Sequence, residues 1–145
     1  MEISAIKSLW EEDSKIDNTN LHNDSINIAR LHSKYYNIFI EERITLIKHQ
    51  TKMKKLKRDK LEFFSQGPNE ETQKKGWQYP AAKGLILKAE IPIYMDADDD
   101  MIELTIKIEI QQEKVEFLRS IITTFKNRNF EIRNAIDYQK FIMGA

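Results

Sequence analysis

The fold is decided by residues 21–65, which read LHNDSINIARLHSKYYNIFIEERITLIKHQTKMKKLKRDKLEFFS and contain neither glycine nor proline. Apolar side chains recur along this run at helical intervals, and they are Leu21, Ile28, Leu31, Tyr35, Ile38, Ile40, Ile44 and Ile47. The preceding Asp17-Asn-Thr-Asn20 supplies residues that favour the N-cap of a helix. We therefore expect one very long N-terminal helical segment, or two helices joined by a subtle bend.

The long segment is expected to end at Gly67, which suits a helix C-cap, and Pro68 then blocks continuation. Residues 69–83 are polar and contain further breakers, so we expect a mobile connection there. Residues 85–87 and 91–94 have the composition of short extended pieces. On the N-terminal side, residues 2–12 have the apolar pattern of a short amphipathic helix.

The C-terminal part allows two interpretations. Five aliphatic side chains alternate with polar ones, as in a strand, and they are Ile102, Leu104, Ile106, Ile108 and Ile110. The same residues also fit helical sets that continue towards Ile122, after an acidic start. We expect a helix over 99–127, then a turn in which Asn129 adopts the left-handed conformation, and a final helix over 130–142. The fold class is therefore mainly α.

Composition excludes several classes of protein. The chain has 145 residues, no cysteine, three histidines and a formal net charge of zero. Without cysteine there is no disulfide scaffold, thiolate catalysis or cysteine-based zinc site, so we expect no enzyme and no cofactor. No apolar run approaches the roughly 20 residues that cross a bilayer, and the first residues lack the pattern of a secretory signal. We expect a cytoplasmic protein that does not enter membranes.

The zero net charge conceals two opposite poles. The basic window contains Arg43, Lys48, Lys52, Lys54, Lys55, Lys57, Arg58 and Lys60, opposed only by Asp59. The acidic window contains Asp96, Asp98, Asp99, Asp100, Glu103, Glu109, Glu113 and Glu116, against Lys107 and Lys114. On a helix the cations form two neighbouring lines whose mutual repulsion a polyanion would remove. The alternative is a basic face that contacts only solvent.

Aromatic residues near these cations favour single-stranded nucleic acid. Tyr35 follows Lys34, and Phe63 and Phe64 follow the basic window. Cations that contact the phosphates, with aromatic rings on which bases stack, are typical of binding to single strands without sequence preference. The alternative for all three aromatic residues is packing inside the protein.

The acidic run also raises the hypothesis of a metal site. Asp96, Asp98 and Asp100 have the opening spacing of a calcium-binding loop. However, Met101 stands where the loop needs glycine, and Lys107 stands where it needs a bidentate glutamate. We therefore expect no metal and interpret Asp98–Asp100 as a helix cap.

The chain resembles the UvsY family of phage recombination mediator proteins from residue 14 to the end. The motifs that carry the resemblance are Ile16-Asp17-x-Thr19-x-Leu21, Leu31-x-Ser33-Lys34 followed by Tyr35, Arg58-Asp59-Lys60-Leu61 followed by two aromatic residues, and Phe125-Lys126-x-Arg128-x-Phe130-x-Ile132. Two positions depart from the family pattern. Asp59 replaces a small residue between the two cations, and Asn129 stands where glycine is typical.

The resemblance implies a non-catalytic accessory of phage DNA recombination, repair and replication. Such proteins form closed rings of about six or seven identical subunits, bind single-stranded DNA and help a RecA-like recombinase to displace single-strand-binding protein. It implies that Arg58 and Lys60 contact DNA and that C-terminal helices hold the ring. We expect the ring contacts at Phe117, Ile121, Phe125, Phe130 and Ile136, whose apolar surface exceeds what a short helix pair buries.

We accordingly divide the chain into a helical DNA-binding region (1–66), a linker with short extended segments (67–95) and a C-terminal helical assembly region (96–145). Two other classes of function remain open. One is a helical scaffold or adaptor that does not bind nucleic acid. The other is a small metal-dependent nuclease that uses Asp96–Asp100, although no accompanying residues form a recognisable catalytic arrangement.

Overall fold

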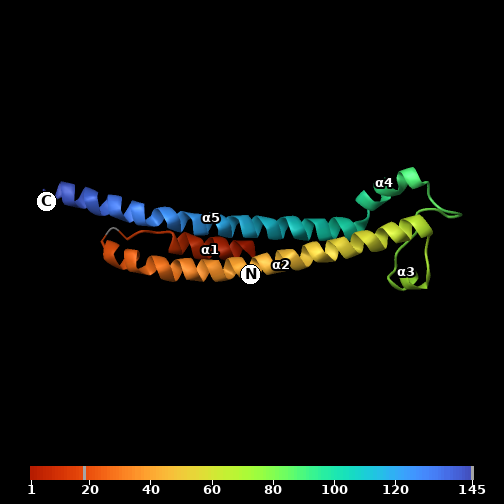
Figure 1. Cartoon of the computed structure of the whole chain (residues 1–145), viewed down its shortest axis with the longest axis horizontal. Helices are drawn as coiled ribbons and strands as arrows, with labels where there is room; N and C mark the ends of the chain where they lie inside the picture. Colours follow the sequence, from red (N-terminus) through yellow and green to blue (C-terminus); the bar gives the residue numbers. More distant parts are fainter. Residues whose placement is uncertain (18, 145) are drawn as a thin grey trace. The chain divides into compact units, whose positions relative to one another are not determined.

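The protein, described here as a computed structural model, is built from helices (Figure 1). The structure describes residues 1–17 and 19–144, so Asn18 of the expected N-cap cluster lies outside the described residues. The helices are α1 (Ile3–Asp13), α2 (Leu21–Gln66), α3 (Glu70–Lys74), the 3₁₀ helix η1 (Lys88–Glu90), α4 (Ile91–Asp96) and α5 (Asp99–Ile142). No strand occurs in the described part of the chain. The mainly α fold is therefore confirmed.

The chain divides into two compact units. The first unit combines Met1–Ile44 with Gln111–Ala145, and the second unit is Thr45–Ile110. The first therefore contains α1, the N-terminal part of α2 and the C-terminal part of α5. The second contains the remaining part of each long helix together with α3, η1 and α4.

Aromatic and aliphatic side chains from all three helices form the core of the first unit. Tyr35 is fully buried, and Phe125 is 3% exposed. Trp10 of α1 contacts both rings edge-on, with centroid distances of 5.4 Å to Tyr35 and 5.6 Å to Phe125. Because α1 contributes Ile6 and Trp10 to this core, it completes the apolar contacts between α2 and α5 (Figure 1).

A buried arginine joins α5 to the end of α1. The Arg128 guanidinium donates hydrogen bonds to the backbone carbonyls of Asp13 (3.0 Å), Ser14 (2.8 Å) and Lys15 (3.4 Å). The last carbonyls of a helix lack partners within that helix. Arg128 therefore supplies donors to a helix end that would otherwise be unsatisfied.

The turn expected at 127–129 was wrong, because α5 continues unbroken from Asp99 to Ile142. Asparagine inside a helix costs only a fraction of 1 kcal/mol relative to good helix formers. That small cost is exceeded by the packing of Phe125, Arg128 and Ile132, which are all buried and are spaced by three and four residues. Asn129 is thus an ordinary helical residue.

Burial of Glu42 is compensated by polar contacts within the first unit. The Gln111 amide donates to the Glu42 backbone carbonyl (2.7 Å) and to its carboxylate (2.6 Å). The Lys114 ammonium lies 3.9 Å from the same carboxylate. Burial alone would raise the pKa of Glu42, but these contacts and the Met1 ammonium hold it below its ordinary value.

The start of α5 is helical, as expected, rather than a strand. The Asp98 carboxylate accepts a hydrogen bond from the backbone N–H of Met101 (3.0 Å), and Asp99 and Asp100 occupy the first turn. This confirms the interpretation of the acidic run as a helix cap. The apparent period of two arises because two helical lines alternate along the sequence. One line is exposed and consists of Ile102, Ile106 and Ile110, and the other is half-buried and consists of Leu104 and Ile108.

An aromatic core holds the second unit together. Phe63, Phe64, Ile91 and Met95 are buried, and Trp77, Tyr79, Ile86 and Tyr94 pack against them. The Tyr79 hydroxyl donates to the Phe64 carbonyl and accepts from the Ile86 N–H, both at 3.1 Å. Within the connection expected over residues 69–83, Trp77 and Tyr79 therefore pack against this core.

Two local signals explain the path between α2 and α5. Gly67 ends α2 with a positive φ of 87°, as expected for a C-cap, and a Cβ there would meet the Leu85 side chain at 3.1 Å. Asn69 and Thr72 form a reciprocal capping box that starts α3. The extended piece expected at 91–94 was wrong, because α4 covers those residues with Pro92 in its first turn, where proline is tolerated.

Candidate nucleic-acid interface

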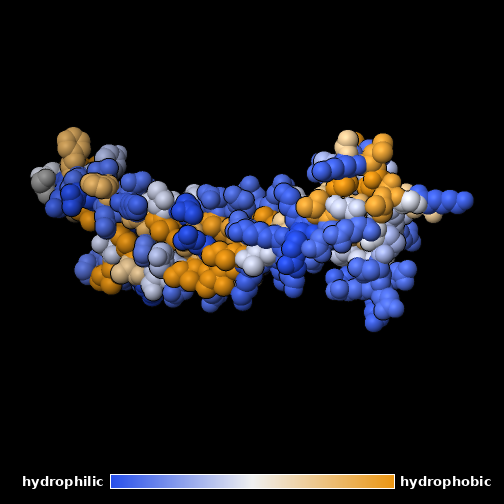
Figure 2. All heavy atoms as spheres, turned by 45° about the vertical axis from the view of Figure 1, so that its right-hand side comes forward, coloured by the Kyte–Doolittle hydropathy of each residue, from blue (hydrophilic) through white to orange (hydrophobic). Residues whose placement is uncertain are grey.

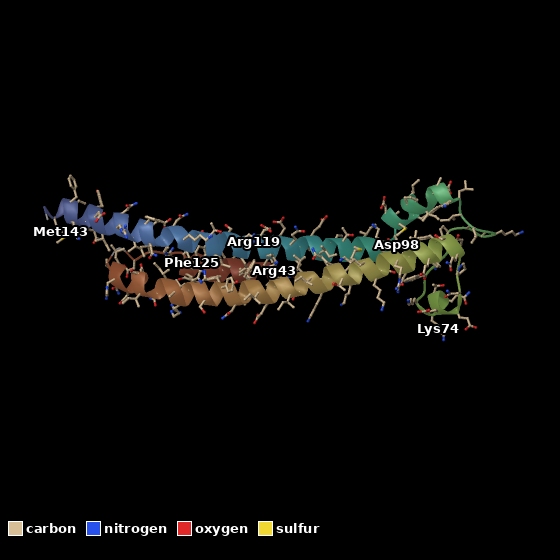
Figure 3. All side chains as sticks on the ribbon, viewed as in Figure 1. Arg43, Lys74, Asp98, Arg119, Phe125 and Met143 are labelled. Atoms are coloured by element: carbon tan, nitrogen blue, oxygen red, sulfur yellow. The ribbon has the colours of Figure 1, made fainter. Side chains whose placement is uncertain are left out.

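Six cations form an exposed basic face on the second-unit part of α2, and they are Lys48, Lys52, Lys54, Lys55, Lys57 and Arg58. The opposite side of the helix carries Leu46, Met53, Leu56, Lys60 and Phe63, which are buried or half-buried at intervals of three, four and seven residues. Because this inner face fixes the helix, the six cations need not contribute to packing. Figure 3 shows side chains along α2 extending away from the ribbon.

Arg58 remains accessible although it has an acidic neighbour. Its guanidinium lies 3.1 Å from the Asp59 carboxylate, and its side chain is 65% exposed. Exposed ion pairs of this kind contribute little to stability. The guanidinium can therefore exchange this partner for a phosphate, although Asp59 weakens the local positive potential.

Lys60 differs from the other cations of the basic window, because its side chain is buried and paired with carboxylates. Its side chain is only 3% exposed, and its ammonium lies 3.0 Å from the Asp98 carboxylate and 2.9 Å from that of Asp100. The same ammonium lies 3.8 Å from the centre of the Trp77 ring. Lys60 is thus a structural cation that joins the end of α2 to the start of α5 (Figure 3 labels Asp98).

The three expected stacking residues are also buried. Phe63 and Phe64 are 3% and 4% exposed in the second-unit core. Tyr35 is fully buried in the first unit, where its hydroxyl donates to the Asp13 carboxylate at 2.8 Å. Burial and this carboxylate raise the pKa of Tyr35 above its ordinary value, so it remains a neutral donor.

Lys34 is engaged beside Tyr35. Its ammonium donates to the Asp13 carboxylate at 2.6 Å, and its side chain is 34% exposed. Burial alone would raise the pKa of Asp13, but the hydrogen bonds from Lys34 and Tyr35 hold it below its ordinary value. A phosphate at Lys34 would compete with this carboxylate, so we leave Lys34 out of the basic face.

The expected ring contacts divide into buried and accessible residues. Ile121 and Phe125 are 1% and 3% exposed because they belong to the first-unit core. Phe117 and Ile136 are half-buried, and Phe130 is 62% exposed. Sequence reasoning missed other exposed apolar side chains of α5, namely Ile102, Ile106, Ile110, Tyr138, Phe141 and Ile142.

The described residues contain neither a cluster of metal-binding side chains nor a membrane-spanning helix. Among residues 1–17 and 19–144 there is no group of three or more histidine, aspartate or glutamate side chains arranged to hold a metal ion. In the same residues, no helix is long and apolar enough to cross a membrane. Figure 2 shows apolar atoms gathered at the α4 end of the second unit, where Leu85, Leu87 and Ile93 are exposed.

Comparison with known proteins assigns the family. The family model described as "Recombination, repair and ssDNA binding protein UvsY" matches residues 9–145. The fold is similar to crystal structures of the bacteriophage T4 recombination mediator protein UvsY. One (lattice type II) has a TM-score of 0.83 and 18% identity, covering 99% of this chain and 98% of that chain. Another (lattice type IV) has a TM-score of 0.78 and 19% identity, covering 97% and 98%. No curated protein matches the sequence. Because the family model spans nearly the whole chain, the protein belongs to the UvsY family of recombination, repair and single-stranded-DNA-binding proteins.

Proposed function

We propose that this protein is a non-catalytic recombination mediator whose basic face on α2 contacts the phosphates of single-stranded DNA. The observation that carries the proposal is the exposure of six cations over three helical turns, with the packing of the helix provided by its opposite side. Like charges three and four residues apart destabilise a helix. A bound polyanion removes this repulsion, so binding is favoured beyond the direct attraction.

Assembly into a closed ring of about six or seven subunits would convert these weak contacts into firm binding. One neutral protomer with one basic face binds a strand weakly. Several faces on one ring bind the same strand at a high effective concentration, which raises avidity without new contacts. Exposed apolar side chains on α5 support such assembly, and the C-terminal ones are Phe130, Tyr138, Phe141 and Ile142.

The proposed role in recombination follows from how such a complex holds DNA. Many separate phosphate contacts can be released one at a time, and none of them requires a particular base. A RecA-like recombinase can therefore take over the strand gradually in place of single-strand-binding protein. We propose that this transfer occurs in the cytoplasm of the host cell.

Replacing Lys52, Lys55 and Arg58 by glutamine is expected to weaken binding to a thymidine oligonucleotide about a hundredfold at 0.1 M salt. Each lost phosphate contact changes the slope of log affinity against log salt by about 0.7 for single strands, so the slope should flatten by about two. The measurement is fluorescence anisotropy over a series of salt concentrations.

The matched control replaces three exposed lysines elsewhere, Lys7, Lys107 and Lys140, by glutamine and so makes the same charge change. This variant should retain most of the affinity and the slope. If both triple variants lost the same affinity, binding would depend on the net charge of the protein and not on the position of the cations. Absence of binding by the unaltered protein, even in dilute buffer, would favour the scaffold or adaptor class instead.

A second experiment tests assembly. Phe130 and Phe141 are 62% and 81% exposed, so replacing both by aspartate should leave the helical content unchanged. We expect the variant to sediment as smaller species and to bind oligonucleotides more weakly, because avidity is lost. Replacing Ile40, which is 40% exposed on α2, by aspartate is the control. Unchanged mass in the Phe130/Phe141 variant would place the contacts between subunits elsewhere.

A further inference from the structure

Because Tyr35, Phe63 and Phe64 are buried, contacts to bases require other rings. In the first unit, α2 exposes His32 and Tyr36, which are four residues apart. Their rings are nearly parallel, with centroids 5.8 Å apart and an interplanar angle of 10°. They therefore form a short stack at the surface, and Tyr36 is 45% exposed.

An open pocket of about 480 Å³ lies beside this stack. The residues that line it are Ser25, Ile26, Ile28, Ala29 and His32 from α2, and Phe125, Lys126 and Asn129 from α5. The Phe125 and His32 rings are steeply inclined to each other, with an interplanar angle of 72° and a centroid distance of 6.2 Å (Figure 3 labels Phe125). The walls are thus mostly apolar and aromatic, with one hydroxyl from α2 and one amide and one ammonium from α5.

The chemistry of the pocket distinguishes between possible occupants. A mostly apolar cavity of several hundred Å³ with a few polar groups is typical of sites for small ring systems. Lys126 carries a positive charge, and no carboxylate is among the side chains that line the pocket. Lys126 and Asn129 are exposed, and a purely apolar side chain from a second copy would make no hydrogen bond with either of them. A nucleotide offers partners to both.

We propose that this pocket is a subsite for one unpaired nucleobase of the bound strand. The base stacks on the outer face of His32 and extends the His32–Tyr36 stack. The Asn129 amide, which has both a donor and an acceptor, meets the polar edge of the base. The Lys126 ammonium contacts the adjoining phosphate. This inference rests on the proposed binding of single-stranded DNA and adds a base contact to it.

The test compares a thymidine oligonucleotide with an abasic strand of the same length and charge. Stacking of one base on an aromatic side chain contributes enough for an approximately tenfold preference for the strand with bases. The full-length protein should show this preference at constant salt. Replacing His32 by leucine keeps an apolar wall but removes the ring, so the ratio of the two affinities should fall towards one.

A matched control and a second variant make the result specific. His22 is also an exposed histidine of α2 and does not line the pocket, so His22→Leu should keep the tenfold ratio. Ala29→Trp fills the pocket without removing a ring, and it should also abolish the preference for bases. In all variants the affinity for the abasic strand should stay unchanged, because the basic face is intact.

Three outcomes would overturn the inference, and they separate it from the proposed function. Equal binding of both strands by the unaltered protein removes the base subsite but leaves phosphate binding in place. If both His32→Leu and Ala29→Trp keep the preference for the strand with bases, the base does not bind in this pocket. If these variants change the mass of the oligomer, the pocket instead contacts a second copy of the protein. Failure to bind either strand in dilute buffer contradicts the proposed function itself.

Discussion

Replacing Arg128 by leucine is expected to lower the free energy of unfolding by about 3 kcal/mol or more, because hydrogen bonds from a charged donor contribute roughly 1.5–3 kcal/mol each. Arg128 is 4% exposed and donates to three carbonyls at the end of α1. Leucine would remove the donor of these three partly buried hydrogen bonds. The release of α1 would also expose Trp10, which packs against Tyr35 and Phe125.

Urea unfolding measured by circular dichroism gives the change in stability, and hydrogen exchange of the α1 amides locates it. The control is Arg133→Leu, because Arg133 is exposed on the same helix and has only a distant contact with the Phe130 ring. That variant should differ from the unaltered protein by less than about 0.5 kcal/mol. If both arginine variants were equally stable, the contacts of Arg128 with α1 would not persist in solution.

The long helices could be predicted because several local signals agree. In α2 the apolar spacing, the absence of breakers and Gly67 all indicate one helix with a defined end. At the start of α5, Asp98 and the two following acidic residues identify the cap. A strand over 102–110 would have required a second strand with which to pair. The helical pattern continues into Val115 and Leu118, and this continuation correctly predicted a helix.

The errors arose where packing within the chain overrides a local signal. Asn127 and Asn129 are typical of a turn, but the burial of Arg128 and Ile132 keeps α5 intact. Pro92 and the neighbouring isoleucines suggested an extended piece, yet proline fits the first turn of α4. The contacts of Arg128 with α1 join residues more than 110 positions apart, and no local pattern indicates them.

Part of the candidate site could also be predicted from the sequence. The six exposed cations follow from the charge pattern alone. The charge pattern along the sequence also includes Lys60, although Lys60 lies on a different side of the helix from the six. It lies four residues after Leu56 and three before Phe63, so it continues the inner face. The same spacing predicts burial of Phe63, whereas the partners Asp98 and Asp100 are 38 and 40 positions away and could not be inferred.

Lys60→Met is therefore expected to destabilise the second unit by about 3 kcal/mol, because removal of one member of a buried ion pair leaves the other charge uncompensated. Methionine has a similar volume, so the loss would come from the charge rather than from a cavity. The Asp98 carboxylate is 13% exposed and would lose its cation, whereas Asp100 is 49% exposed and remains partly solvated. The ammonium also contacts the Trp77 ring, so tryptophan fluorescence should report the change.

The same variant distinguishes a structural lysine from a DNA contact. At a temperature where Lys60→Met is fully folded, its affinity for single-stranded DNA should keep the salt slope of the unaltered protein. Arg58→Met, two residues earlier and 65% exposed, should show the reverse, with near-normal stability and a slope flatter by about 0.7. A flatter slope with unchanged stability in Lys60→Met would mean that the ammonium leaves Asp98 and Asp100 to bind phosphate. The two cations of the Arg58-Asp59-Lys60 element would then act together on DNA, and the burial of Lys60 would describe only the protein without its ligand.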